Sequence, residues 1–304
     1  MTVLVTGGTG FVGRHIVHAL ARSDINVVSY NRDYAEHESP LVHCVQGELF
    51  DIPALIRTIR DHDVTAAIHT AAMSHPGISI ELPITTFAAN VDGTLKLFEA
   101  ARMAGLRRIV NFSSECAYGH QPLDTVVTEA ATPAPNTPYG VTKVTTEHLG
   151  RVYTDLYGLD VMSLRVSEVY GPGLRMPEVL KDMLNAAIHG EAFTMPEGAE
   201  HRFHFVHVQD VAAAAILAAT AAQPKQPVYN ISGGRQVTLG ELAALITSRY
   251  PQAHIALGPG FWTGWDRQGP WDISAATRDL GYVPQWTLER GLADYADWLS
   301  DHPY

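Results

Sequence analysis

Short apolar runs alternate with amphipathic stretches along the first half of the chain. The apolar runs predict buried strands, and the amphipathic stretches carry apolar residues at helical spacing. The expected strands are Thr2–Thr6, Asn26–Tyr30, Ala66–His69, Arg108–Phe112 and Val161–Val166. The expected helices are Phe11–Arg22, Asp51–His62, Phe87–Ala104 and Tyr139–Tyr157. Strands that alternate with helices favour βαβ units, so we expect an α/β fold with a doubly wound parallel sheet.

The pattern becomes less regular beyond Gly171. A helix near Pro177–His189 is followed by short strands and by loops rich in glycine and aromatic residues. Thr238 and Glu241 have the spacing of a capping box, which predicts a helix that runs to Arg249.

These changes in pattern suggest two domains. We expect the first over residues 1–170 and a smaller mixed α/β lobe over 171–304. Within that lobe, residues 203–232 are expected to return to the main sheet.

Several glycines lie between the first expected strand and the first expected helix. The motif has a glycine at every third position: Gly7, Gly10 and Gly13. It is therefore one residue longer than the GxGxxG fingerprint. Glycine allows a tight turn and close approach of the backbone to a pyrophosphate, and a helix N-terminus offers free N–H groups. We therefore predict a dinucleotide site here that includes Phe11 and Val12.

The end of the second strand bears on which dinucleotide is bound. An acidic residue there suits the ribose of NAD, whereas an arginine suits the 2′-phosphate of NADP. The chain reads Tyr30-Asn31-Arg32-Asp33, so Asn31 and Arg32 are expected to contact the adenosine ribose. Arg32 favours NADP over NAD, but the acidic Asp33 that follows it leaves NAD as an alternative cofactor.

A tyrosine and a lysine could carry out proton transfer. Tyr139 and Lys143 are four residues apart, so a helix places both on one face. The ammonium would favour ionisation of the phenol, whose ordinary pKa is about 10. Ser114 follows a strand at the edge where such sheets bind ligands, and its hydroxyl could hold a substrate oxygen while Tyr139 exchanges the proton. Ser113 is an alternative for that role.

Composition narrows the classes of function. The net charge is −11, which argues against nucleic acid and against a membrane surface as partners. The longest apolar run, Val211–Ala222, is too short to span a bilayer. With no signal segment evident and only two cysteines, Cys44 and Cys116, far apart, we expect a cytoplasmic protein.

Fifteen histidines raise the question of a metal site. His201, His204 and His207 form the nearest approach to a cluster. If the segment is a strand, side chains alternate between faces and one metal cannot collect all three. We expect no metal.

Taken together, these features resemble the extended short-chain dehydrogenases/reductases, the epimerase/dehydratase family. The matching segments are residues 6–13 (TGGTGFVG), 68–72 (IHTAA), 90–94 (NVDGT), Ser114 with Tyr118 and Gly119, Tyr139 with Lys143, 164–173 (LRVSEVYGPG), 202–210 (RFHFVHVQD) and 272–274 (DIS). The resemblance covers nearly the whole chain.

The resemblance implies a Rossmann fold and hydride transfer between a substrate carbon and a nicotinamide. Tyr139 would be the acid/base, Ser114 would hold the reacting oxygen and Lys143 the nicotinamide ribose. Asn90 would supply an active-site hydrogen bond. Glu48 would lie near the adenine. The further residues implied at the cofactor are Leu49, Ala71, Ala72 and Ser167.

Departures from the family pattern bear on the substrate. Glu168 stands where nucleotide-sugar enzymes usually have asparagine near the diphosphate, and a carboxylate there would repel it. Arg202 is kept at a position that often pairs with that diphosphate, but a second arginine is not evident. Glu115 and His75 are further candidates for substrate contact. Glu115 and Cys116 replace the acidic pair of sugar-nucleotide 4,6-dehydratases, so that activity is not expected.

Three functions remain at this point. The leading hypothesis is an NAD(P)-dependent oxidoreductase acting on a hydroxyl or carbonyl carbon of a small, sugar-like substrate. The alternative is a nucleotide-sugar 4-epimerase with tightly bound NAD and no net redox change. A redox-sensing regulator is disfavoured by the complete Ser114, Tyr139 and Lys143 set. Similar proteins pair two long helices with a twin, so a homodimer is expected, with Leu95, Phe98, Val144 and Leu149 as contacts.

Overall fold

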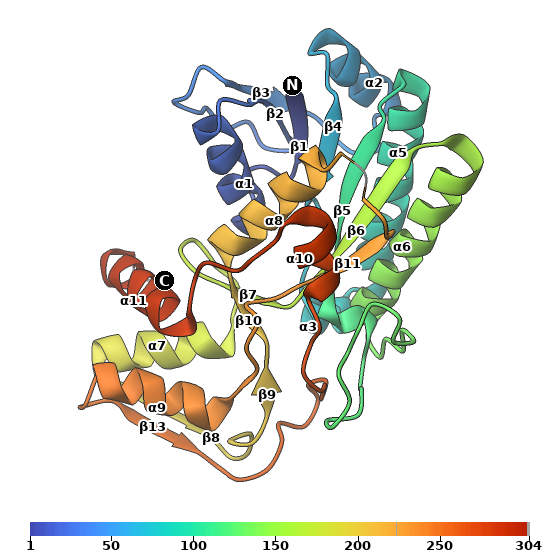
Figure 1. The fold of residues 1–304 in the computed structure, drawn as a ribbon. Helices are drawn as coiled ribbons and strands as arrows, with labels where there is room; N and C mark the ends of the chain where they lie inside the picture. Colours follow the sequence, from blue (N-terminus) through green and yellow to red (C-terminus); the bar gives the residue numbers. More distant parts are fainter. Residues whose placement is uncertain (223, 303–304) are drawn as a thin grey trace.

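Seven parallel strands form the centre of the molecule. The structure is a computed structural model that describes residues 1–222 and 224–302 (Figure 1). The strand order is β11-β6-β5-β4-β1-β2-β3. The strands are β1 (Thr2–Thr6), β2 (Asn26–Asn31), β3 (Val42–Gln46), β4 (Ala66–His69), β5 (Arg108–Ser114), β6 (Asp160–Val166) and β11 (Val228–Ile231). The doubly wound parallel sheet predicted from the sequence is confirmed.

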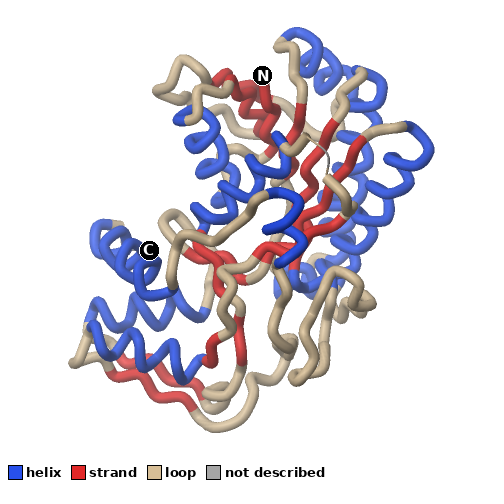
Figure 2. The backbone as a smooth tube through the Cα atoms, viewed as in Figure 1, coloured by secondary structure: helices blue, strands red, loops and turns tan. Residues whose placement is uncertain are grey.

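Helices cover both faces of this sheet (Figure 2). One face packs against α1 (Phe11–Arg22), α8 (Val208–Thr220) and α10 (Ser274–Leu280). The other packs against α2 (Ile52–Asp61), α5 (Gly93–Ala104) and α6 (Pro138–Tyr157). Each face therefore buries its own apolar cluster, which explains why the strands read as continuous apolar runs.

Several elements of the main sheet domain differ from the expected ones. β3 was not predicted, because its residues are polar at two positions and only partly buried at the sheet edge. The helix expected over Phe87–Ala104 is three segments: α4 (Pro83–Phe87), a π-helical turn (Ala88–Asp92) and α5. β5 is two residues longer than expected, so Ser114 is its last residue.

The remaining elements form a second lobe beside the carboxyl ends of the strands (Figure 1). Its helices are α7 (Val179–His189), α9 (Leu239–Arg249) and α11 (Leu288–Asp301), whereas α3 (Pro76–Glu81) packs against α4 and α6 beside the sheet. Its short strands are β8 (Ala192–Met195) with β13 (His254–Leu257), β9 (Arg202–Phe203) with β12 (Val237–Thr238), and β7 (Glu168–Tyr170) with β10 (Phe205–His207). The capping box at Thr238 and Glu241 is present.

The segment 201–207 is not the single strand that the sequence suggested. It breaks at His204 between β9 and β10, and α8 begins at Val208 with His207 as its cap. β11, which follows α8 in the chain, joins the edge of the main sheet beside β6. None of the helices in the described part of the chain could cross a membrane.

Candidate active site

The glycine-rich turn after β1 leaves the start of α1 open. Gly7 has φ +74°, and its carbonyl oxygen accepts a hydrogen bond from the Gly10 amide at 2.9 Å. A Cβ on Gly13 would lie 2.0 Å from that oxygen, whereas one on Gly10 would meet only that oxygen, at 3.1 Å. Gly10 caps the helix without any side chain, and Phe11 and Val12 follow in its first turn. Free amides above an open surface fit a bound pyrophosphate.

Asn31 holds this turn from the neighbouring strand. Its side-chain oxygen accepts from the Thr9 amide at 3.0 Å, and its amide nitrogen donates to the Ser29 hydroxyl at 2.9 Å. The Asn31 side chain is therefore engaged within the protein. Arg32 and Asp33, next along the chain, are exposed.

The other residues expected at the cofactor follow the ends of several strands. Glu48 is exposed, and its backbone oxygen accepts from the Tyr30 hydroxyl at 3.1 Å. Leu49 packs toward Gly93, Ala71 lies against Gly7, and Ala72 is exposed. The Ser167 hydroxyl is buried without a hydrogen-bond partner. A buried hydroxyl left unpaired at this edge fits a group that binds there.

Asn90 lies in the π-helical turn and joins three segments. Its side chain accepts from the Met73 amide at 2.8 Å and donates to the Met73 carbonyl at 3.1 Å and to the Thr142 hydroxyl at 3.0 Å. It thus fixes the loop after β4 against α6.

Ser114 and Tyr139 meet at the end of β5. Their side chains hydrogen-bond each other, and both residues are nearly buried. Ser114 also accepts from the Cys116 amide at 3.2 Å. Ser113 points elsewhere, since its hydroxyl donates to Glu147 at 2.5 Å. Of the two serines considered, Ser114 is the one beside the phenol.

Lys143 lies one helical turn beyond Tyr139. Its ammonium donates to the Phe112 carbonyl at 2.7 Å and lies 5.4 Å from the centre of the Tyr139 ring. Burial lowers the pKa of Lys143 to about 8. Burial, the largest cause, also raises the pKa of Tyr139 above its ordinary value, so the lowering expected from the sequence is not found in the free protein. The phenol therefore holds its proton in the free protein.

Glu115 and Glu168 form a hydrogen-bonded pair of carboxyl groups in the same cleft. Burial, the largest cause, raises the pKa of both above the usual range. A Glu115 carboxyl whose pKa lies at about 8 keeps its proton at neutral pH, and its contact with Glu168 favours that form. Arg165, a possible partner of Glu168, instead binds Glu147 at 2.6 Å. Burial and the nearby Glu168 also raise the pKa of Glu178, to about 8.

A pocket of about 150 Å³ opens beside this pair. His75 lines it and also caps α3, accepting from the Ile78 amide at 3.2 Å. Arg202 lines it from β9 with its side chain exposed. The other lining residues are Pro76, Gly77, Ile80, Glu115, Cys116, Asn136, Thr137, Phe203, His204, Gly264, Trp265, Asp266 and Gln268.

Several of these residues were missed by sequence reasoning. Glu178 had a usable signal, because it precedes an apolar helical stretch and caps α7 through the Leu180 and Lys181 amides. Trp265, Asp266 and Gln268 lie in an irregular loop, where no periodic pattern indicates direction.

The three histidines first considered for a metal lie in separate aromatic surroundings. His201 contacts Phe203, His204 lies 5.5 Å from Trp271 between ring centres, and His207 stacks on Trp286 at 4.0 Å. Across residues 1–222 and 224–302, no group of three or more His, Cys, Asp or Glu side chains is arranged to hold a metal ion.

Comparison with known proteins agrees with this geometry. A model of the NAD dependent epimerase/dehydratase family matches residues 3–232. The dTDP-glucose 4,6-dehydratase of Streptomyces antibioticus is 29% identical over 99% of this chain and 93% of its own length. The dTDP-L-rhamnose 4-epimerase of Burkholderia thailandensis is 27% identical over 98% of this chain and 94% of its own.

Solved structures are similar over the full chain. A UDP-glucose 4-epimerase of Thermotoga maritima, solved with UDP-glucose, superposes with a TM-score of 0.89 at 26% identity, covering 99% of each chain. A UDP-glucose 4-epimerase of Thermus thermophilus, solved with NAD, gives 0.88 at 27% identity, covering 99% of this chain and 100% of its own. The chain therefore belongs to the NAD-dependent epimerase/dehydratase family and is an enzyme of the dehydrogenase/epimerase type.

Proposed function

We propose that this enzyme transfers a hydride between a nicotinamide cofactor and a hydroxyl-bearing carbon of a sugar-like substrate. The observation that carries the proposal is the hydrogen bond between Ser114 and Tyr139, with Lys143 a turn away. The three side chains lie at the carboxyl end of β5, where open α/β sheets bind ligands.

The proposed roles follow from the chemistry of each side chain. The cofactor, held at the Gly7–Gly13 turn, supplies the hydride acceptor or donor. Tyr139 exchanges the proton of the substrate hydroxyl, and Ser114 holds the same oxygen in place. The Lys143 ammonium, fixed by the Phe112 carbonyl, stabilises the phenolate whenever Tyr139 gives up its proton.

For the substrate, we propose a small polyhydroxylated compound, or a sugar derivative whose phosphates lie away from Glu168. The Glu115–Glu168 pair presents several oxygens that accept hydrogen bonds from hydroxyls. A diphosphate in this cleft of low dielectric would need cationic partners, and Glu115, Glu168 and Asp266 would repel it whenever they are ionised. Among the pocket-lining residues, Arg202 is the one lysine or arginine available to offset that repulsion.

For the cofactor, we propose that NADP is preferred over NAD. Arg32 is exposed at the end of β2, and the described residues include no hydrogen bond or ion pair of its guanidinium. It is thus available to a 2′-phosphate, while the neighbouring Asn31 is engaged with the glycine-rich turn.

A nucleotide-sugar 4-epimerase is the second candidate. Its support is the likeness to solved UDP-glucose 4-epimerases over the full chain. A 4,6-dehydratase is less well supported, because burial raises the pKa of Cys116 and keeps the thiol neutral where a carboxylate would be required.

We also propose a cytoplasmic homodimer formed through α4, α5 and α6. Ile84, Leu95, Val141 and Leu156 expose apolar side chains on these helices, and Figure 1 shows α5 and α6 side by side on one flank. Phe98, expected as a contact, is fully buried in the core and cannot take part. The cytoplasm is proposed because both cysteines are free.

Removal of the Tyr139 hydroxyl tests the proton-transfer role. Tyr139→Phe should still bind the cofactor but lose at least about a hundredfold in turnover, the usual scale for a positioned acid/base. Turnover is measured by nicotinamide absorbance with the hydroxylated compound that works best for the unmodified enzyme. Tyr153→Phe, which removes a hydroxyl from the same helix away from the site, is the control. Near-normal turnover of Tyr139→Phe would exclude the role.

Calorimetric titration with UDP, UDP-glucose and dTDP tests the substrate class. We expect no micromolar binding, because the pocket offers a diphosphate one arginine, Arg202, beside two carboxyl residues, Glu115 and Asp266. Glu168→Asn should not create such binding, whereas Glu168→Gln should weaken the true substrate. A cofactor titration of the same sample checks that the site is intact. Micromolar binding of any of the three nucleotides would favour the epimerase.

Substitution of Arg32 tests the cofactor preference. Arg32→Ala should weaken NADP by at least about tenfold, since it removes a charge-assisted hydrogen bond, and should leave NAD nearly unchanged. Dissociation constants from fluorescence titration give the comparison, with Arg22→Ala at the far end of α1 as the control. Equal losses for both cofactors, or tighter binding of NAD at the outset, would contradict the preference.

Sedimentation velocity at micromolar concentration tests the dimer. The unmodified chain should sediment as a dimer. Introducing charge with Leu156→Glu should produce monomers, because it buries a carboxylate in an apolar contact. Val126→Glu introduces the same charge at an exposed apolar position in a loop outside these helices, and should leave the dimer intact. A single monomeric species for the unmodified chain would refute the proposal.

A further inference from the structure

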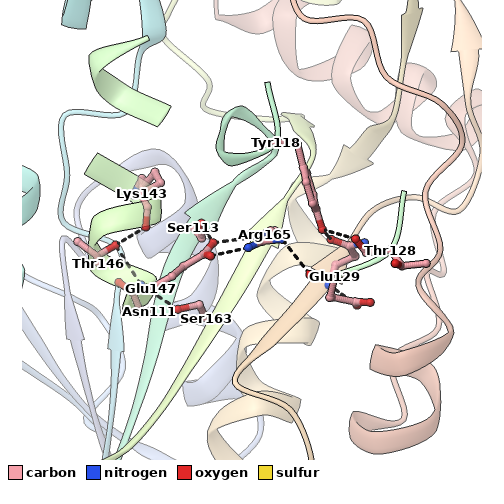
Figure 3. A network of polar contacts seen from close by, with 11 residues as sticks. Asn111, Ser113, Tyr118, Thr128, Glu129, Lys143, Thr146, Glu147, Ser163 and Arg165 are labelled. Atoms are coloured by element: carbon pink, nitrogen blue, oxygen red, sulfur yellow. Dashed lines mark hydrogen bonds and ion pairs between the residues drawn. The ribbon is translucent and has the colours of Figure 1, made fainter. Parts of the chain in front are cut away.

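An ion pair is buried beneath the candidate site, between α6 and the sheet (Figure 3). Arg165 on β6 binds Glu147 on α6 through two parallel contacts of 2.9 and 2.6 Å. The two side chains are only 4% and 7% exposed. Such a pair is costly to desolvate and often adds little net stability, so its presence calls for another explanation.

The Glu147 side of the pair connects to the acid/base residues. Glu147 lies four residues after Lys143 and eight after Tyr139, and helical spacing places all three on one face of α6. The same carboxylate accepts from the Ser113 hydroxyl at 2.5 Å, and Ser113 precedes Ser114 on β5. One carboxylate thus links the helix to the end of the strand.

The Arg165 side connects to the segment that lines the pocket. Its guanidinium lies 4.5 Å from the centre of the Tyr118 ring. Tyr118 directly follows the short helical turn Glu115–Ala117, which carries Glu115 and Cys116 into the pocket. The Tyr118 hydroxyl donates to the Asn230 side-chain oxygen at 2.7 Å. The Tyr118 side chain is therefore contacted both at its ring face, by the guanidinium, and at its hydroxyl.

A third contact reaches the connection before α6. Arg165 donates to the Glu129 carbonyl at 3.3 Å, and the Glu129 carboxylate accepts from the Asn230 amide at 2.8 Å. Figure 3 shows Arg165 between these groups, with Glu147 and Ser113 on one side and Tyr118 and Glu129 on the other.

We propose that Arg165 is a positioning residue that holds the acid/base helix, the end of β5 and the pocket segment 115–118 in one fixed arrangement. Arginine suits this role because its planar group makes a two-pronged bond to a carboxylate while its face stacks on an aromatic ring. A lysine provides neither. The proposal rests on the catalytic roles proposed above, but its test uses no substrate.

The two cysteines of the chain provide an internal comparison. Cys116 lies in the pocket segment, whereas Cys44 lies on β3 at the far edge of the sheet. Alkylation by iodoacetamide, followed by mass spectrometry, gives a rate for each thiol. The ratio of the Cys116 rate to the Cys44 rate reports movement of the pocket segment. A general loosening of the fold would raise both rates and leave the ratio unchanged.

The test variant is Glu147→Gln with Arg165→Met, which removes both charges and leaves an amide oxygen for Ser113. The matched control is Arg108→Met with Asp160→Asn. Arg108 begins β5 and Asp160 begins β6. Their side chains form an ion pair of 2.6 Å at the end of these strands opposite to the candidate site. Arg165→Lys is a third variant, which retains the charge should the double variant fail to fold.

We expect the cysteine ratio to rise by at least about tenfold in the test variant, as local opening of a previously fixed segment would produce. It should rise in Arg165→Lys as well, and should not change in the control. An unchanged ratio in a folded test variant, or an equal rise in the control, would overturn the proposal.

A second readout follows Lys143 directly. The groups facing its ammonium are Glu147, Cys116, His69 and the Tyr139 ring. Acetylation of Lys143 at a series of pH values gives its titration midpoint. Because the Glu147 charge raises the pKa of Lys143, the midpoint should move to lower pH in the test variant. A midpoint that stays in place or rises would contradict the link from Glu147 to Lys143 on which the proposal draws.

These readouts distinguish failure of the positioning role of Arg165 from failure of the proposed chemistry. An unchanged ratio and midpoint would reject Arg165 as a positioning residue without affecting the role of Tyr139. Normal turnover of Tyr139→Phe would reject the proposed chemistry while leaving the rearrangement of the pocket segment observable.

Discussion

The buried pairing of Glu147 with Arg165 is the interaction on which the ligand-binding edge of the sheet depends. Two charges taken out of water are tolerated only where every donor and acceptor around them is satisfied. Here Ser113, the Glu129 carbonyl and the Tyr118 ring complete the surroundings of the pair. Satisfying the charges brings α6, β5, β6 and the pocket segment together, and these elements carry the candidate catalytic groups.

Desolvation has a second consequence at the same edge, because it favours the neutral form of the groups around the site. Burial raises the pKa values of Tyr139, Glu115 and Glu168 and lowers that of Lys143 to about 8. Protons are therefore held on oxygens next to the place proposed for the substrate. Such a site suits proton transfer between fixed partners.

The first half of the molecule follows closely from its sequence, because local periodicity and burial agree there. Thr2–Thr6, Phe11–Arg22 and Ala66–His69 were predicted with the bounds that the structure has. β3 escaped prediction because an edge strand with half-exposed residues lacks a continuous apolar run. The π-helical turn at Asn90 was also missed, since its apolar spacing is that of an ordinary helix.

The candidate site could be predicted only as far as each residue's position depends on its own element. Tyr139 and Lys143 share a helix face, so their proximity follows from spacing alone. The partner of Glu168 could not be found in this way, because Glu115 lies in the helical turn that follows β5 and the contact depends on tertiary packing. Trp265 and Asp266 enter the pocket from an irregular loop, whose direction no sequence pattern encodes.

Nicotinamide absorbance, followed while the purified enzyme is given NADP or NAD with a panel of hydroxylated compounds, tests the account most directly. Net hydride transfer to the nicotinamide, from a substrate without a diphosphate, is its central claim. The account predicts accumulation of reduced nicotinamide with at least one polyol or simple sugar derivative. Conversion of a UDP-sugar to its 4-epimer with no net change in absorbance, and no change with any polyol, would contradict it.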